Sequence, residues 1–132
     1  MPERKDLVFQ NISRERYREL YNFCLQYEEK KSRLNEIYSL SSPPAGEPVS
    51  GGLPGKTTEN KALKAIQYRE DIDLITECLN AAGRRFGNWM IKALFENVCH
   101  GVRFYNLEIY TTKENFYEAR RLFFMLLDSR KR

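Results

Sequence analysis

The sequence predicts an all-α protein, with a long amphipathic helix in residues 1–40, a flexible linker over 41–58 and a helical bundle over 59–132 that ends in a helix-turn-helix. Three observations predict this fold class. Apolar residues recur at three- and four-residue steps, helix-capping residues precede these stretches, and no alternating apolar and polar run is long enough to specify a strand. The length of 132 residues suits a single domain overall.

The first helix is predicted to begin after Ser13, which can act as its N-cap, and to run over 14–40. Its apolar stripe consists of Tyr17, Leu20, Tyr21, Cys24, Tyr27, Leu34, Ile37 and Tyr38. This spacing resembles a short coiled-coil seam. Two arrangements fit it, packing within the chain and pairing of residues 17–38 with a second copy. Fewer than four clean heptads do not decide between them.

Residues 41–58 read SSPPAGEPVSGGLPGKTT and contain four of the five prolines and four of the seven glycines. Proline removes a backbone donor and breaks helices, and the segment has few apolar side chains to bury. We therefore expect a flexible connector. Its last residues, GLPGKTT, look like the end of a phosphate-binding loop, but the upstream glycine and the preceding strand are missing.

A second helix is predicted over about 59–82, with Thr57 or Thr58 as its N-cap and Gly83 at its end. Its apolar side is expected to comprise Ala62, Ala65, Ile66, Ile72, Ile75, Leu79 and Ala82. The helix also contains the acidic run EDID. Consecutive residues on a helix point in different directions, so this run predicts a solvated face rather than a metal site.

A third helix is predicted over 89–99, with Asn88 as its N-cap and Gly101 at its end. Its inward side chains are expected to be Trp89, Met90, Leu94, Phe95 and Val98. His100 stands next to that end, where a cation complements the helix dipole. We expect it to be a surface residue rather than a catalytic base.

The carboxy-terminal segment has the layout of a helix-turn-helix over about 102–129. A short helix over 102–108 is predicted first, although the stretch GVRFYNLEIY also fits a strand. The dipeptide Ile109-Tyr110 would form a tight turn. The sequence TTKE then has the pattern of a capping box, which predicts that a longer helix begins there.

This last helix is predicted to be amphipathic. Its buried side comprises Phe116, Ala119, Phe123, Leu126 and Leu127, and its outward side comprises Lys113, Tyr117, Glu118, Arg121 and Asp128. Phe124 and Met125 lie off the main stripe. They either widen the core contact or form a surface for association between copies of the chain.

The net charge of +4 is unevenly distributed. Between Ala119 and Arg132 there are five basic residues and one acidic residue, so this end carries the whole net charge. A basic end suits a polyanionic partner, because phosphate contacts release counterions. Helix carboxy-termini also collect Lys and Arg for a purely structural reason, the helix dipole.

Duplex DNA is the partner that the helix-turn-helix layout predicts, with the first turns of the second helix in the major groove. In such a groove Asn can read adenine and Arg guanine, while other basic side chains contact phosphates. The candidate DNA-binding residues are Lys113, Asn115, Tyr117, Glu118, Arg120, Arg121, Arg130, Lys131 and Arg132.

Nothing in the sequence points to an enzyme, a cofactor or a metal site, because the common phosphate-loop, dinucleotide and nucleophile motifs are missing. The only histidine, His100, adjoins Cys99, a pair too close to supply a tetrahedral zinc set. The three cysteines are expected to be reduced and mostly buried. No apolar run approaches the length of a membrane span, and the start MPERKDLVF does not fit a secretory signal, so we expect a cytoplasmic protein.

The order of elements and the block WMIKALFENVCHGVRFYNLEIYTTKENFYEARRLFFMLL resemble small phage-encoded transcriptional regulators of the ArpU and RinA type, whose carboxy-terminal half is similar to sigma-factor region 4. The resemblance implies that 102–108 is a positioning helix and 112–128 a recognition helix. It implies a phage or prophage activator of late genes, with RNA polymerase as a further candidate partner.

This sequence departs from the family pattern in its turn, Ile109-Tyr110, and in placing Phe124 and Met125 beyond the usual core positions. An alternative function is therefore kept. It is a helical phage assembly, packaging or adaptor protein that acts by self-association, either through 17–38 or through Phe124 and Met125.

Overall fold

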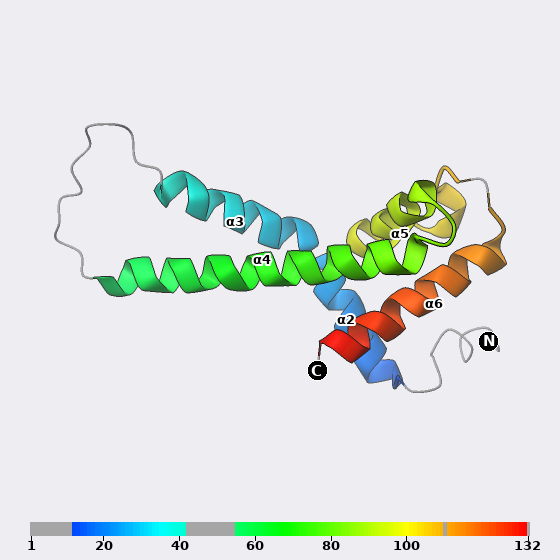
Figure 1. Cartoon of the computed structure of the whole chain (residues 1–132), viewed down its shortest axis with the longest axis horizontal. Coiled ribbons are helices and arrows are strands. Elements are labelled where there is room, and N and C mark those ends of the chain that lie inside the picture. The colour runs from blue at the N-terminus through cyan, green and yellow to red at the C-terminus, as the bar shows by residue number, and fades with distance from the viewer. Residues whose placement is uncertain (1–11, 42–54, 110, 132) are drawn as a thin grey trace. The chain divides into compact units, whose positions relative to one another are not determined.

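The structure is a computed structural model that describes residues 12–41, 55–109 and 111–131. Over these residues it is all-helical and contains no strand, which confirms the predicted fold class. The elements are α2 (Arg14–Leu25), α3 (Tyr27–Ser41), α4 (Gly55–Gly83), α5 (Asn88–His100), the 3-10 turn η1 (Phe104–Asn106) and α6 (Lys113–Arg130) (Figure 1). Most of the predicted linker, residues 42–54, lies outside the described residues, as do Tyr110 and Arg132.

The chain divides into two compact units. The hairpin unit is Tyr27–Asp73, which contains α3 and the first part of α4. The bundle unit combines the described residues of Met1–Gln26 and Leu74–Arg132, so it contains α2, the end of α4, α5, η1 and α6. This division cuts across the segments expected from the sequence, since residues 1–40 contribute to both units.

The stretch predicted as one helix over 14–40 forms two helices instead, and this prediction was wrong in that respect. The break is at Gln26, whose N–H donates to the Phe23 carbonyl at 3.3 Å, a bond of the 3-10 type. Neither Pro nor Gly marks the break in the sequence. The predicted start is confirmed, because the Ser13 hydroxyl accepts a hydrogen bond from the Arg16 amide at 3.1 Å.

The core of the bundle unit forms where α2, α5 and α6 pack against one another. Its largest fully buried side chains include Leu20, Ile75, Met90, Leu94, Val98, Phe116, Phe123, Phe124 and Leu127. The α2 part of the first predicted helix therefore packs within its own chain. Phe124 is fully buried, which excludes it as a surface for association, whereas Met125 is 46% exposed.

Two side chains of the bundle unit lie on the opposite side from the predicted one. Trp89 was expected to face inward but is 42% exposed, because the adjacent Met90 occupies the core position and neighbouring helical residues point in different directions. Asp128 was expected to face outward but is buried. Its carboxylate accepts a hydrogen bond from Arg16 Nε at 2.7 Å, and this bond is the main reason that the pKa of Arg16 is raised.

Helix α4 begins at Gly55, so it starts before the caps that were predicted at Thr57 or Thr58. At its other end Gly83 is still helical. A Cβ atom at Gly83 would lie 2.6 Å from Cγ1 of Ile91, so this glycine permits a close approach of α4 and α5. Along the predicted apolar side Ile75 is buried, but Ile66 is 53% exposed.

In the hairpin unit α3 lies alongside the first part of α4 (Figure 1). Lys30 Nζ pairs with Asp71 Oδ2 at 3.0 Å, and the Arg69 guanidinium lies 5.5 Å from the centre of the Tyr38 ring. Leu34 and Ala65 are buried. The acidic run around Asp71 thus supplies one interhelical ion pair.

Candidate nucleic-acid interface

The predicted positioning helix over 102–108 is not an α-helix, and the helix-turn-helix over about 102–129 is not formed as expected. Only one 3-10 turn, Phe104–Asn106, lies in this stretch. The reason is that α5 ends at Gly101 in the left-handed conformation and the following amides cap its carbonyls. The connection over 101–112 is also much longer than the three to four residues of a helix-turn-helix turn.

The Val102 carbonyl is held by the Asn97 side chain, whose Nδ2 donates to it at 2.8 Å. Farther along the connection, the Phe104 ring packs on Phe116 of α6, with ring centres 5.2 Å apart. These two contacts anchor the connection to α5 and to α6. They hold the residues around Val102 and Phe104 against these two helices.

The predicted recognition helix is present as α6, and its start is confirmed within one residue. Thr112 is the N-cap, and its Oγ1 accepts a hydrogen bond from the Asn115 amide at 3.1 Å. Lys113 and Asn115 in the first turn are exposed, as predicted. The amino-terminal end of α6 therefore presents polar and basic side chains to solvent.

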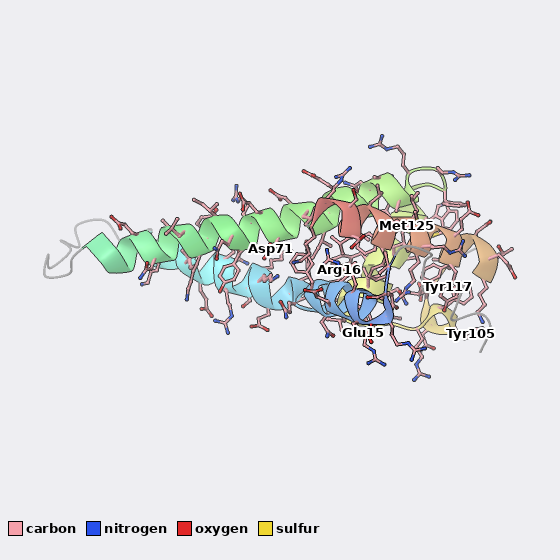
Figure 2. All side chains as sticks on the ribbon, turned by 90° about the horizontal axis from the view of Figure 1, so that it is seen from below. Glu15, Arg16, Asp71, Tyr105, Tyr117 and Met125 are labelled. Carbon is pink, nitrogen blue, oxygen red and sulfur yellow. The ribbon has the colours of Figure 1, made fainter. Side chains whose placement is uncertain are left out.

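Two tyrosines flank Lys113 at this end of α6. Its Nζ donates to the Tyr105 hydroxyl at 3.2 Å and lies 5.3 Å from the Tyr105 ring centre and 5.9 Å from that of Tyr117. Figure 2 shows both side chains at the same end of the bundle unit, one from the connection and one from α6. Tyr105 is 77% exposed. We call Tyr105, Lys113 and Tyr117 the aromatic–lysine cluster.

Two other residues of α6 that were predicted to contact DNA are an ion-paired Glu118 and a half-buried Arg121. Glu118 is exposed and pairs with Arg85 at 3.4 Å. Arg121 is half-buried, and its Nε is a buried donor with no acceptor in the structure. Lys113, Tyr117 and Arg121 therefore do not form the single open basic face that the helical spacing indicates.

Arg120 is buried, so its prediction as a DNA contact was wrong. Its Nε donates to Asn97 Oδ1 at 2.6 Å and its Nη2 to the Tyr17 hydroxyl at 2.7 Å. The guanidinium carbon also lies 4.9 to 5.6 Å from the ring centres of Tyr17, Tyr21 and Phe124. Burial raises the pKa of Tyr21, although the Arg120 charge acts in the opposite direction.

The basic residues at the carboxy-terminal end do not gather into one patch. Arg130 Nη1 lies 3.5 Å from Glu77 Oε1 of α4. Lys131 Nζ lies over the Phe23 ring of α2, 4.6 Å from its centre. Arg132 lies outside the described residues. Within the described part of the chain, the basic side chains at this end contact residues of neighbouring helices.

Tyr105 was not among the residues predicted for the site, and neither were its exposed neighbour Arg103 and the more distant Arg85. A local signal for the first two was present. The letters RFYN combine a cation with two aromatic residues in a segment that lacks a helical apolar stripe. Aromatic and basic residues side by side are typical of surfaces that bind nucleic acids.

Comparison of the chain with protein-family models, curated proteins and solved structures finds no match in any of the three. Within the described ranges, no three His, Cys, Asp or Glu side chains are grouped so that they could hold a metal ion. No helix in those ranges has both the length and the apolar character needed to cross a bilayer. The function of the chain is therefore inferred from the residues at the start of α6.

Proposed function

We propose that the chain is a DNA-binding transcriptional regulator and that it contacts duplex DNA with the aromatic–lysine cluster and the first turn of α6. The observation that carries this proposal is the exposure of Lys113, Asn115 and Tyr105 at one capped helix start. The amino terminus of a helix attracts phosphate through its free N–H groups and its dipole. Lys113 adds a full positive charge there.

Four residues of this surface have roles that follow from their chemistry. Lys113 contacts a phosphate, and Arg103 in the preceding connection adds a second cation. Asn115 can accept from and donate to an adenine edge in the major groove. Tyr105 packs its ring against a sugar or a base, and its hydroxyl can donate a hydrogen bond to a phosphate oxygen. In this proposal the start of α6 and the connection before it contact the DNA, and no helix-turn-helix is involved.

The resemblance of the carboxy-terminal block to ArpU- and RinA-type regulators supports the same proposal, since its recognition-helix region coincides with α6. A phage or prophage origin and a role in transcription belong to this proposal. RNA polymerase would then be a second partner. The missing positioning helix means that α6 would be held on DNA by the connection over 101–112.

The proposal is tested by fluorescence anisotropy of labelled duplexes from phage promoter regions, titrated with the full chain at several salt concentrations. We expect binding that weakens steeply as salt rises, because phosphate contacts release counterions. Lys113→Ala and Tyr105→Ala should each weaken binding about tenfold, the equivalent of about 1.4 kcal/mol. Lys61→Ala is the matched control, because Lys61 is an exposed cation of α4 far along the chain from the cluster.

Two outcomes would overturn the proposal. One is that the wild-type chain binds no duplex at low salt. The other is that Lys61→Ala weakens binding as much as Lys113→Ala, which would indicate a diffuse charge effect without a defined surface.

Self-association is the second candidate function, and a feature of the hairpin unit favours it. Leu63 and Ile66 are 59% and 53% exposed and stand three residues apart on α4, so they share one helix face. Tyr38 of α3 is 43% exposed. A helix face with exposed large apolar side chains is typical of an interaction surface.

This second candidate is tested by sedimentation of the wild-type chain and of the double variant Leu63→Lys with Ile66→Lys. We expect a wild-type dimer or larger assembly, and a monomer for the variant, because two added charges oppose burial of that face. A wild-type monomer at all concentrations would exclude self-association through the hairpin unit.

A further inference from the structure

A hollow of about 220 Å³ lies in the bundle unit between α6 and the turn that follows α4. Its walls include Arg85, Phe86, Glu118, Arg121, Leu122 and Met125. Sites for complete small molecules usually measure about 300–1,000 Å³. The hollow therefore suits one or two side chains of a larger partner better than a separate ligand.

One residue of the wall, Arg121, has a hydrogen-bond donor that the fold leaves unused. The Nε–H of Arg121 is buried and donates to no acceptor in the structure. A buried donor without an acceptor is costly, and native structures nearly always supply one. That donor is too buried for a ligand in the hollow to reach, but the positive charge of the Arg121 guanidinium would face a carboxylate placed there.

A second arginine on the wall, Arg85, makes a weak ion pair and a contact with Phe86, whose ring centre lies 5.7 Å from the guanidinium carbon. Arg85 Nη1 lies 3.4 Å from Glu118 Oε2, and the two side chains are 68% and 50% exposed. Exposed pairs of this kind contribute little to stability, because water screens them. Arg85 can therefore exchange Glu118 for an incoming carboxylate. Two arginines and one glutamate leave the rim with an excess of positive charge.

The rest of the wall is apolar. Met125 is 46% exposed, and Leu122 and Phe86 beside it are only partly buried. Figure 2 shows Met125 farther along α6 than Tyr117, away from the aromatic–lysine cluster. Methionine adapts its shape to different apolar partners. An apolar wall favours a peptide over a nucleic acid, since protein–DNA interfaces are more polar and more strongly charged.

We propose that this hollow binds an acidic amphipathic helix of a partner protein, which places an apolar side chain against Leu122 and Met125 and carboxylates against Arg85 and Arg121. This is recognition of a helix in a groove, with charge complementarity setting the choice of partner. The inference does not depend on the proposed DNA binding, because none of these four residues belongs to the aromatic–lysine cluster.

The test uses three fluorescent helical peptides of about four turns that share one leucine stripe. Their polar faces carry Glu, Gln or Lys. Anisotropy with the full-length chain should show binding of the Glu peptide, about tenfold weaker binding of the Gln peptide and none of the Lys peptide. Arg85→Ala and Met125→Glu should each weaken the Glu peptide about tenfold. Arg84→Ala is the matched control, because Arg84 is an exposed neighbour in the same turn that does not line the hollow.

Several results would overturn the inference. Equal affinity for the Glu and Gln peptides would remove the role of the arginines. An equal loss of affinity for the Glu peptide in Arg84→Ala and Arg85→Ala would mean that the peptide responds to general positive charge and does not bind in this hollow. Competition between the Glu peptide and duplex DNA, with both weakened equally by Arg121→Ala, would assign the hollow to nucleic acid. Arg85 and Met125 are exposed and Arg121 is half-buried, and circular dichroism verifies that each variant folds.

Discussion

The Nε–H of Arg120 donates to Oδ1 of Asn97 at 2.6 Å, and this bond joins α6 to α5 inside the bundle unit. The same amide donates from its other side to the Val102 carbonyl. No carboxylate of the described residues pairs with Arg120, so its charge is offset by the Tyr17 hydroxyl, the Asn97 oxygen and the faces of three rings. One buried amide thus connects the core to the segment that carries Tyr105.

Replacing Arg120 by Met should lower the free energy of unfolding by about 2–4 kcal/mol, because Asn97 and Tyr17 would lose their buried partner. Urea unfolding followed by circular dichroism measures this change. Lys92→Met removes an exposed cation from α5 and should change the free energy by less than about 0.5 kcal/mol. A stability for Arg120→Met equal to that of Lys92→Met would contradict the buried role.

Gly83→Ala should destabilise the fold by about 1–3 kcal/mol, since the new methyl group would overlap Cγ1 and the backbone of Ile91.

At Gly101 the cause of destabilisation differs. Its φ of +74° is unfavourable for Ala, whereas a Cβ there would only make ordinary contacts of 3.9 Å with Leu25 and Tyr21, so Gly101→Ala should cost about 1 kcal/mol. Gly101→Asn should cost less, because Asn tolerates this conformation. Thermal unfolding of Gly83→Ala, Gly101→Ala and Gly101→Asn would distinguish destabilisation by steric overlap from destabilisation by backbone strain.

Thr112→Ala should lower stability by about 1 kcal/mol, because the Asn115 amide loses its capping acceptor. Thr112→Ser keeps the hydroxyl and should restore most of the loss. The adjacent Thr111→Ala is the control, since Thr111 is not the cap. Equal losses at the two threonines would show that the hydroxyl of Thr112 is not what starts α6.

Burial raises the pKa of the Cys78 thiol above its ordinary value of 9.0. Because the folded pKa is the higher one, the thiol's contribution to stability is present below pH 9.0 and is lost as the pH rises through the folded pKa. Wild-type stability should therefore fall more steeply above that pH than the stability of Cys78→Val. Urea unfolding at several alkaline pH values makes the comparison, and identical pH profiles would refute it.

The helix α6 illustrates what local sequence signals can predict. The sequence predicts a cap at Thr111 or Thr112, of which Thr112 is the one observed, and it predicts the buried Phe116, Phe123 and Leu127. A cap depends on residues three positions apart, and a helical stripe repeats within one or two turns. Both signals are therefore complete within a short stretch of chain. The exposed Lys113 follows from the same two signals.

Other parts of the site could not be predicted in this way. Tyr105 lies in a connection that contacts Asn97 of α5 and Phe116 of α6, and neither contact can be read from the connection's own residues. Arg120 stands one turn from both Phe116 and Phe124, at a core position of the stripe. The sequence predicts it as a DNA contact, and arginine is seldom buried without a partner. Its partners were not visible from α6 alone.

By itself, the sequence determined the all-α class, the start of α6 and most of its core face, because capping and apolar periodicity are local properties. Only the tertiary structure decided that Arg120 lies in the core, that the helix over 14–40 breaks at Gln26 and that residues 102–108 do not form an α-helix. A charged side chain can be buried only where distant groups receive it. Tyr17, 103 positions earlier in the chain, is one of those groups for Arg120.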